Sequence, residues 1–214
     1  MGSSLLITRP ENDFTTRYLS KWSEEIIKEA RSKGINVIDL WRDKANRDRV
    51  IGTLEKTNPR IVFLNGHGSD KFVTGHDNEI ILQEGDGRAV SSKIIFARSC
   101  KSAKILGKIA ITEGATTYLG YDEDFWFKYN VTKTRRPFED KTAALFLEPS
   151  NYLVIYLLKG HSTGLANNKS KNLFKKNIER LLIEGPSAED YDSIRCLYWD
   201  MTHQVCLGEQ DARF

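Results

Sequence analysis

Cysteine is scarce in this 214-residue chain, which has three, Cys100, Cys196 and Cys206, and no Cys-x-x-Cys pair. So sparse and odd a set excludes a secreted disulfide framework and a cysteine-rich zinc site. We therefore expect a reducing compartment, and we expect neither a metal nor a cofactor.

An excess of basic residues and long apolar runs are also missing. Lysine plus arginine (32) nearly balances aspartate plus glutamate (29), which excludes the strongly basic face typical of nucleic-acid-binding proteins. The longest apolar run, 152–158, is far below the roughly 18 residues of a membrane span. The N-terminal residues also lack the pattern of a signal peptide. We expect a cytoplasmic protein that contacts neither membrane nor nucleic acid.

What is present indicates one folded domain over 1–214. Hydrophobic residues make up 40% of the chain, with 5 prolines and 15 glycines, and a chain of this length buries roughly 70% of the surface that its unfolded form exposes. No linker or repeat separates its parts. We expect a core over about 4–121 and a helical C-terminal part over about 138–207.

Short β-rich runs alternate with helical patterns through the first half of the chain. Apolar runs at 5–8, 35–41, 60–65, 93–97 and 116–120 predict strands, and the segments between them predict helices, the first on one face of 14–34. Two weaker runs, 71–75 and 79–83, predict a small hairpin, and Pro149 and Gly160 are expected to separate helices in the last third. The fold class is α/β, with a mostly parallel sheet flanked by helices.

Two loops that follow predicted strands hold residues capable of chemistry. His67 lies in the loop 65–69 and Cys100 in the loop 98–102. The carboxyl ends of neighbouring parallel strands meet at one edge of a sheet, so these side chains can share a crevice. Each also has an ordinary interpretation, because a histidine between glycines can be a turn residue and a lone cysteine is commonly a buried hydrophobe.

Together, His67 and Cys100 fit the requirements of cysteine catalysis. Cys100 precedes a predicted helix and has basic neighbours, conditions that lower the pKa of a thiol. His67 would serve as general base and acid, and the N–H groups of Gly68 and Cys100 would form an oxyanion hole. No acidic third member is evident in the sequence.

The blocks IVFLNGHGS (61–69) and IIFARSCKSA (94–103) resemble the caspase-like, or clan CD, cysteine peptidases. The resemblance continues through ILGKIAITEGATTYLGY and the tail HQVCLGEQDARF. His67 and Cys100 are closer in sequence than the roughly 50 residues of caspases, and the caspase pentapeptide is absent. The chain is therefore most similar to gingipain-like and CHAT-type members.

The resemblance implies a caspase-like three-layer sandwich and a cysteine endopeptidase. His67 and Cys100 would be its catalytic dyad, with Gly68 as an oxyanion donor. It implies a protein or peptide substrate, a regulatory protein partner and a role as a regulated bacterial or archaeal effector.

Candidate substrate-binding residues lie in two places, and they point to opposite preferences. Strand alternation places Arg98 on the face of Cys100, where it would favour an acidic or polar P1 residue. Asp122 and Glu123 follow the next strand and would favour arginine or lysine, with Trp126 as a pocket wall or a cover of the core. In a third interpretation Arg98 pairs with one of these carboxylates, which cancels both preferences.

Three other functions remain open from the residues alone. One is a catalytically silent caspase-like interaction module. Another is a Rossmann-like protein using 66–68 as a phosphate loop, which the missing G-x-G-x-x-G pattern disfavours. The third is a thiol hydrolase or transferase of an unrelated type.

Overall fold

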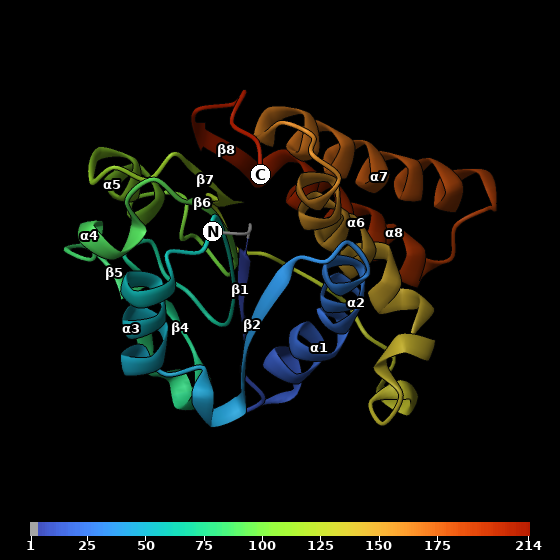
Figure 1. Cartoon of the computed structure of the whole chain (residues 1–214). Coiled ribbons are helices and arrows are strands. Elements are labelled where there is room, and N and C mark those ends of the chain that lie inside the picture. Colours follow the sequence, from blue (N-terminus) through green and yellow to red (C-terminus); the bar gives the residue numbers. More distant parts are fainter. Residues whose placement is uncertain (1–3) are drawn as a thin grey trace.

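A six-stranded sheet forms the centre of the computed structural model, which describes residues 4–214; residues 1–3 of the expected domain lie outside the described residues (Figure 1). The strand order is β2-β1-β3-β6-β7-β8, and only the pairing of β8 with β7 is antiparallel. The strands are β1 (Ser4–Arg9), β2 (Asn36–Trp41), β3 (Ile61–Asn65), β6 (Ile94–Arg98), β7 (Thr117–Tyr121) and β8 (Gln204–Gly208). The prediction of a mostly parallel sheet is confirmed.

Helices cover both faces of this sheet (Figure 1). On one side lie α3 (Arg47–Thr57), α4 (Gly87–Val90), α5 (Leu106–Thr112) and the hairpin of β4 (Phe72–Thr74) and β5 (Ile80–Gln83). On the other lie α1 (Phe14–Trp22), α2 (Glu24–Ser32) and α6 (Lys141–Leu158). Helices α7 (Thr163–Ile183) and α8 (Ala188–His203) follow, and short 3-10 turns occupy Arg42–Lys44, His76–Asn78, Val131–Lys133 and Pro137–Glu139.

The layers follow from alternation along the strands. In β1, Leu5 and Ile7 pack with α1, α2 and α6, whereas Leu6 packs with α3 and the hairpin. Successive side chains of a strand point to opposite faces, so a strand that is apolar throughout supplies two cores at once. The result is the three-layer α/β sandwich and hairpin insertion expected from the sequence.

The predicted helix over 14–34 is divided into α1 and α2 at Ser23. The Ser23 hydroxyl donates to the Leu19 carbonyl at 2.7 Å and accepts a hydrogen bond from Arg98. A serine that bonds back to the preceding turn bends a helix. The apolar periodicity continues across the bend, which is why the pattern reads as one helix.

The expected break at Pro149 is wrong, because α6 runs through it without interruption. Proline lacks an N–H, so the carbonyl of Leu145 loses its helical donor. The side chain of Asn177 on α7 donates to that carbonyl at 2.8 Å instead. Tertiary packing thus compensates for the internal proline.

The C-terminal third is helical, as expected, and ends in β8. Leu145 and Phe146 of α6 pack with Phe174, Leu181 and Leu197 in a separate apolar cluster between α6, α7 and α8. None of the helices within residues 4–214 is long and apolar enough to span a bilayer. After α8 the chain returns to the sheet edge beside β7 (Figure 1).

Candidate active site

Three neighbouring strands, β1, β3 and β6, bring the site together at their carboxyl ends. Asn65 of β3 pairs with Arg98 of β6, so His67 and Cys100 lie at equivalent positions beyond the two strands. The two loops touch: a Cβ added to Gly68 would lie 2.6 Å from the Cys100 carbonyl oxygen. The chain order reverses between β1 and β3, which is where open α/β sheets place their ligand sites.

An acidic partner for His67 comes from the loop after β1. Nε2 of His67 lies 2.6 Å from Oδ2 of Asp13, and both side chains are partly exposed. The other carboxylate oxygen of Asp13 accepts the backbone N–H of Thr16 at 2.7 Å, which caps α1. Burial acts to raise the pKa of Asp13, but the hydrogen bonds from His67 and Thr16 outweigh it and lower the pKa. The carboxylate is therefore held ionised beside the imidazole.

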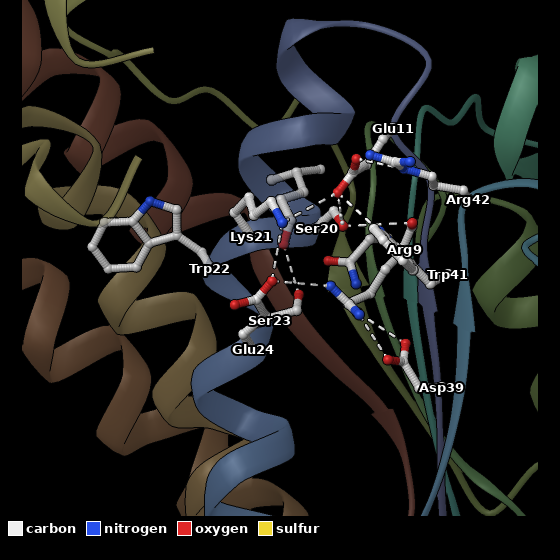
Figure 2. Close-up of polar contacts among 12 residues, drawn as sticks. Arg9, Glu11, Ser20, Lys21, Trp22, Ser23, Glu24, Asp39, Trp41 and Arg42 are labelled. Atoms are coloured by element: carbon white, nitrogen blue, oxygen red, sulfur yellow. Dashed lines mark hydrogen bonds and ion pairs between the residues drawn. The ribbon is translucent and has the colours of Figure 1, made fainter. Parts of the chain in front are cut away.

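The segment that carries Asp13 is anchored through Glu11 (Figure 2). The Glu11 carboxylate accepts from Trp41 Nε1 at 2.9 Å, Arg42 Nε at 3.0 Å and Ser20 Oγ at 3.2 Å. Burial acts to raise the pKa of Glu11, but these donors outweigh it and lower the pKa. The end of β2 and helix α1 thus fix the residue two positions before Asp13.

The β4–β5 hairpin supports both members of the His–Asp pair. The N–H of Thr74 donates to the His67 carbonyl at 2.9 Å. In the turn that follows, Nδ1 of His76 accepts the backbone N–H of Glu11 at 3.3 Å. The small insertion therefore holds the loops of His67 and Asp13 in a fixed relation.

The Cys100 thiol contacts the Phe125 carbonyl, with 3.9 Å between sulfur and oxygen. Within residues 4–214 it makes no hydrogen bond to His67. Burial, aided by the carboxylate of Asp124, raises the pKa of Cys100 to about 11, although the Phe125 backbone and Lys101 act in the opposite direction. The thiol is therefore protonated at neutral pH in this state.

The expected thiolate-stabilising surroundings of Cys100 are wrong. Helix α5 begins only at Leu106, and Lys101 has a left-handed φ of 57°, so Cys100 does not lie at the N-terminus of the helix that follows it. Lys101 pairs with Asp124 at 3.0 Å, and Lys104 is held by Glu123 at 2.6 Å. The basic neighbours are real, but their charges are neutralised by the loop after β7.

The amides expected to form an oxyanion hole are free to donate. Gly68 faces Val73 in an isolated β-bridge, but neighbouring residues make the hydrogen bonds of that bridge. The Ser69 N–H donates to the Phe72 carbonyl, and the His67 carbonyl accepts the Thr74 N–H. Within the described part of the chain, neither Gly68 N–H nor Cys100 N–H donates to a backbone acceptor. Close approach of the two loops requires glycine at 68, because any Cβ there meets the backbone of Cys100.

The prediction that Arg98 binds substrate is wrong, because its side chain is fully buried. The guanidinium donates to Asn65 and Asn151, and to Leu19 and Ser23 of the α1–α2 bend. Burial lowers the pKa of Arg98 to about 9. The side chain of Arg98 points to the sheet face covered by α1, α2 and α6, and these helices enclose it. Within residues 4–214 it forms no ion pair with an acid of the loop after β7, so the third interpretation is wrong too.

The acidic loop after β7 is bound by ion pairs within the chain. Asp122 lies 2.8 Å from Nδ1 of His203, and Glu123 pairs with Lys104. Trp126 is 53% exposed, whereas Phe125 is buried in the core. Glu123 lies beside the loop 98–102, since its carbonyl accepts the Lys101 N–H. The role of Asp122, Glu123 and Trp126 toward a substrate stays a prediction.

A cavity of about 270 Å³ adjoins this loop. It includes Asp122 and Glu123 among its lining residues, and neither His67, Cys100 nor Trp126 lines it. The lining residues are Ala103, Lys104, Lys108, Asp122, Glu123, His203, Val205 and Leu207. The described residues contain no cluster of three or more His, Cys, Asp or Glu side chains that could hold a metal ion.

Asp13 is a candidate site residue that sequence reasoning missed. The sequence does carry a signal for its position: an Asp-x-x-Thr capping pattern opens the first helix directly after the first strand. A strand order that places the first strand beside the third then brings this cap to the histidine loop.

Comparison with known proteins shows a likeness of fold. No family model matches the chain, and no curated protein matches it. A crystal structure of the Arg-specific cysteine proteinase gingipain R superposes with a TM-score of 0.62 at 11% identity, over 100% of this chain and 47% of that one. A complex of the pro- and mature domains of RgpB from Porphyromonas gingivalis gives 0.60 at 11% identity, over 99% of this chain and 48% of that one. The chain spans about half the length of these structures, and it shares the caspase-like fold with them.

Proposed function

We propose that this protein is a cysteine endopeptidase in which Cys100 is the nucleophile, His67 the general base and acid, and Asp13 the residue that orients His67. The observation that carries the proposal is the meeting of the loops that follow three adjacent strands, with Nε2 of His67 2.6 Å from Asp13 and the loop of Cys100 against Gly68. The likeness of fold to a cysteine proteinase supports it.

The chemistry follows from which atoms are already occupied. Because Nε2 of His67 faces Asp13, Nδ1 is left to take the thiol proton as sulfur attacks the scissile carbonyl. The oxyanion would accept the N–H groups of Gly68 and Cys100. His67 then gives the proton to the leaving amine. Water, deprotonated by His67, hydrolyses the thioester and returns the thiol.

The resting thiol must change its surroundings to react. With the pKa of Cys100 near 11, only about one thiol in 10⁴ is ionised at pH 7. Transfer of its contact from Phe125 to His67 would supply the missing base. Catalytic hydrogen bonds are commonly loose in the absence of substrate.

We propose a basic P1 residue as the preferred substrate. Burial of Arg98 removes the cation from which the sequence favoured an acidic one. Glu123 remains beside the loop of Cys100, with Asp122 next to it in the chain. A peptide library varied at P1 tests this preference. Cleavage after arginine or lysine supports it, and cleavage after aspartate contradicts it.

The same library tests the activity itself. Wild type is expected to cleave it, while Cys100→Ala and His67→Ala lose at least about 10³-fold in kcat/KM. Cys206→Ala, which alters a half-buried cysteine outside the site, is the matched control and is expected to retain activity. Equal turnover by all four proteins would show that this site does not catalyse hydrolysis.

One observation favours a second candidate, a catalytically silent caspase-like interaction module. The Cys100 thiol makes a hydrogen-bond contact with the Phe125 carbonyl rather than with His67, and burial raises its pKa. In that case no library member is cleaved, and Cys100→Ala leaves every function unchanged.

The assignment to gingipain-like or CHAT-type peptidases, a cytoplasmic location and a regulatory protein partner are further proposals. They rest on the sequence blocks around His67 and Cys100 and on the scarcity of cysteine.

A further inference from the structure

The segment 122–126 after β7 is the immediate neighbour of the nucleophile. The Lys101 N–H donates to the Glu123 carbonyl at 3.0 Å, and the Cys100 sulfur lies 3.9 Å from the Phe125 carbonyl. The position of this segment therefore determines the surroundings of the thiol.

Helix α8 holds this segment through two hydrogen bonds. Oδ1 of Asp200 accepts the backbone N–H of Trp126 at 2.9 Å. Nε1 of Trp199 donates to the Asp124 carbonyl at 2.9 Å. Two successive residues of the helix thus hold the two residues that flank Phe125.

Asp200 is unusual among the acids of α8. Its side chain is fully buried, and within residues 4–214 its Oδ2 has no hydrogen-bond partner. Burial raises the pKa of Asp200 well above its ordinary range, and the Trp126 N–H only partly opposes this. A buried carboxyl without a cation is costly, and within residues 4–214 the only hydrogen bond that this side chain makes comes from the Trp126 N–H.

We propose that Asp200 is a positioning residue for Cys100: through the Trp126 N–H it fixes the Phe125 carbonyl, and with it the thiol. The inference rests on the proposed function, since it gives the helical C-terminal part a role in the same site. The helix would act through the loop, without touching the substrate.

Two substitutions separate the hydrogen bond from the shape of the side chain. Asp200→Asn keeps an oxygen acceptor for the Trp126 N–H, whereas Asp200→Leu removes it at similar size. Glu189→Gln changes an exposed acid of the same helix and serves as the matched control. The readouts are amide exchange at Trp126, the rate of Cys100 alkylation by iodoacetamide, and kcat and KM for a cleaved peptide.

Asp200→Leu is expected to speed amide exchange at Trp126 about tenfold and to change the rate of Cys100 alkylation about tenfold. It is also expected to lower kcat about tenfold, while KM stays within about threefold of the wild-type value. Asp200→Asn is expected to restore all of these to within about twofold of wild type. A folded Asp200→Leu protein with unchanged alkylation and exchange would overturn the proposal. Rapid exchange of the Trp126 amide in wild type would also overturn the proposal. This measurement needs no variant, so it decides the question even if Asp200→Leu does not fold.

The two proposals fail in different ways. If wild type cleaves no peptide, the proposed function fails, while exchange and alkylation still decide the positioning role. If wild type cleaves peptides and both Asp200 variants match it in exchange, alkylation and kinetics, only the positioning role fails.

Discussion

The buried carboxyl of Asp200 gives a stability prediction with a defined sign. In the folded chain this group is fully buried, accepts one N–H and has no ion-pair partner within residues 4–214, so burial raises its pKa. Above the unfolded-state pKa of about 3.9, the folded state then binds more protons than the unfolded state. The stability that Asp200 contributes is therefore fully present at low pH and falls as pH rises toward the folded pKa.

Asp200→Asn removes this proton while keeping the acceptor for Trp126. Relative to wild type, the variant is expected to gain about 1.4 kcal/mol in free energy of unfolding per pH unit above roughly pH 4.5, until the folded pKa is reached. At lower pH the two proteins should differ little, because both then carry a neutral side chain with one unpaired polar group.

Urea unfolding of both proteins at intervals from pH 4 to pH 8 measures the difference. Glu189→Gln, at an exposed position, should show no comparable slope. The reasoning is refuted if the difference between wild type and Asp200→Asn does not depend on pH, or if the variant loses stability relative to wild type as pH rises.

Three further substitutions test the site and its frame. Asp13→Asn keeps the helix cap, because asparagine caps as well as aspartate, but removes the charge beside His67; kcat is expected to fall by on the order of 10²–10⁴ with little change in melting temperature. Gly68→Ala forces a Cβ against the Cys100 carbonyl and is expected to lower kcat/KM by about 10²-fold, since small misplacements of reacting groups are costly; unchanged kinetics would mean that the loop does not carry the oxyanion hole. Asn177→Ala leaves the carbonyl freed by the internal proline without a donor and should cost about 1–3 kcal/mol in urea unfolding, with activity unaffected.

The positions of the five parallel strands were largely predictable from the sequence, whereas the edge strand β8 was not predicted. Leu5, Leu6 and Ile7 form a continuous apolar run because β1 is covered on both faces, which is the pattern of a buried parallel strand. The same pattern before His67 and Cys100 predicts two strand ends at one edge of the sheet. Their pairing through Asn65 and Arg98 confirms that part of the reasoning.

What the sequence could not supply were contacts between distant segments. Arg98 reads as a cation beside the nucleophile, yet its burial depends on Asn151, far along the chain in α6. Asp13 reads as a helix cap, and its approach to His67 depends on the strand order. Pro149 reads as a break, and only Asn177 of another helix explains why α6 continues. Local patterns specify elements, and these three residues owe their roles to tertiary packing.

The assignment of Cys100 as the nucleophile is tested most directly by covalent trapping. Peptidyl acyloxymethyl ketones with arginine, lysine or aspartate at P1 would be incubated with wild type, His67→Ala and Cys100→Ala, and the adducts located by mass spectrometry of digested protein. We predict one adduct per chain, on Cys100, formed faster with the basic reagents and strongly slowed in His67→Ala. Modification of Cys196 or Cys206 instead, or labelling of Cys100 at the same rate without His67, would contradict the account.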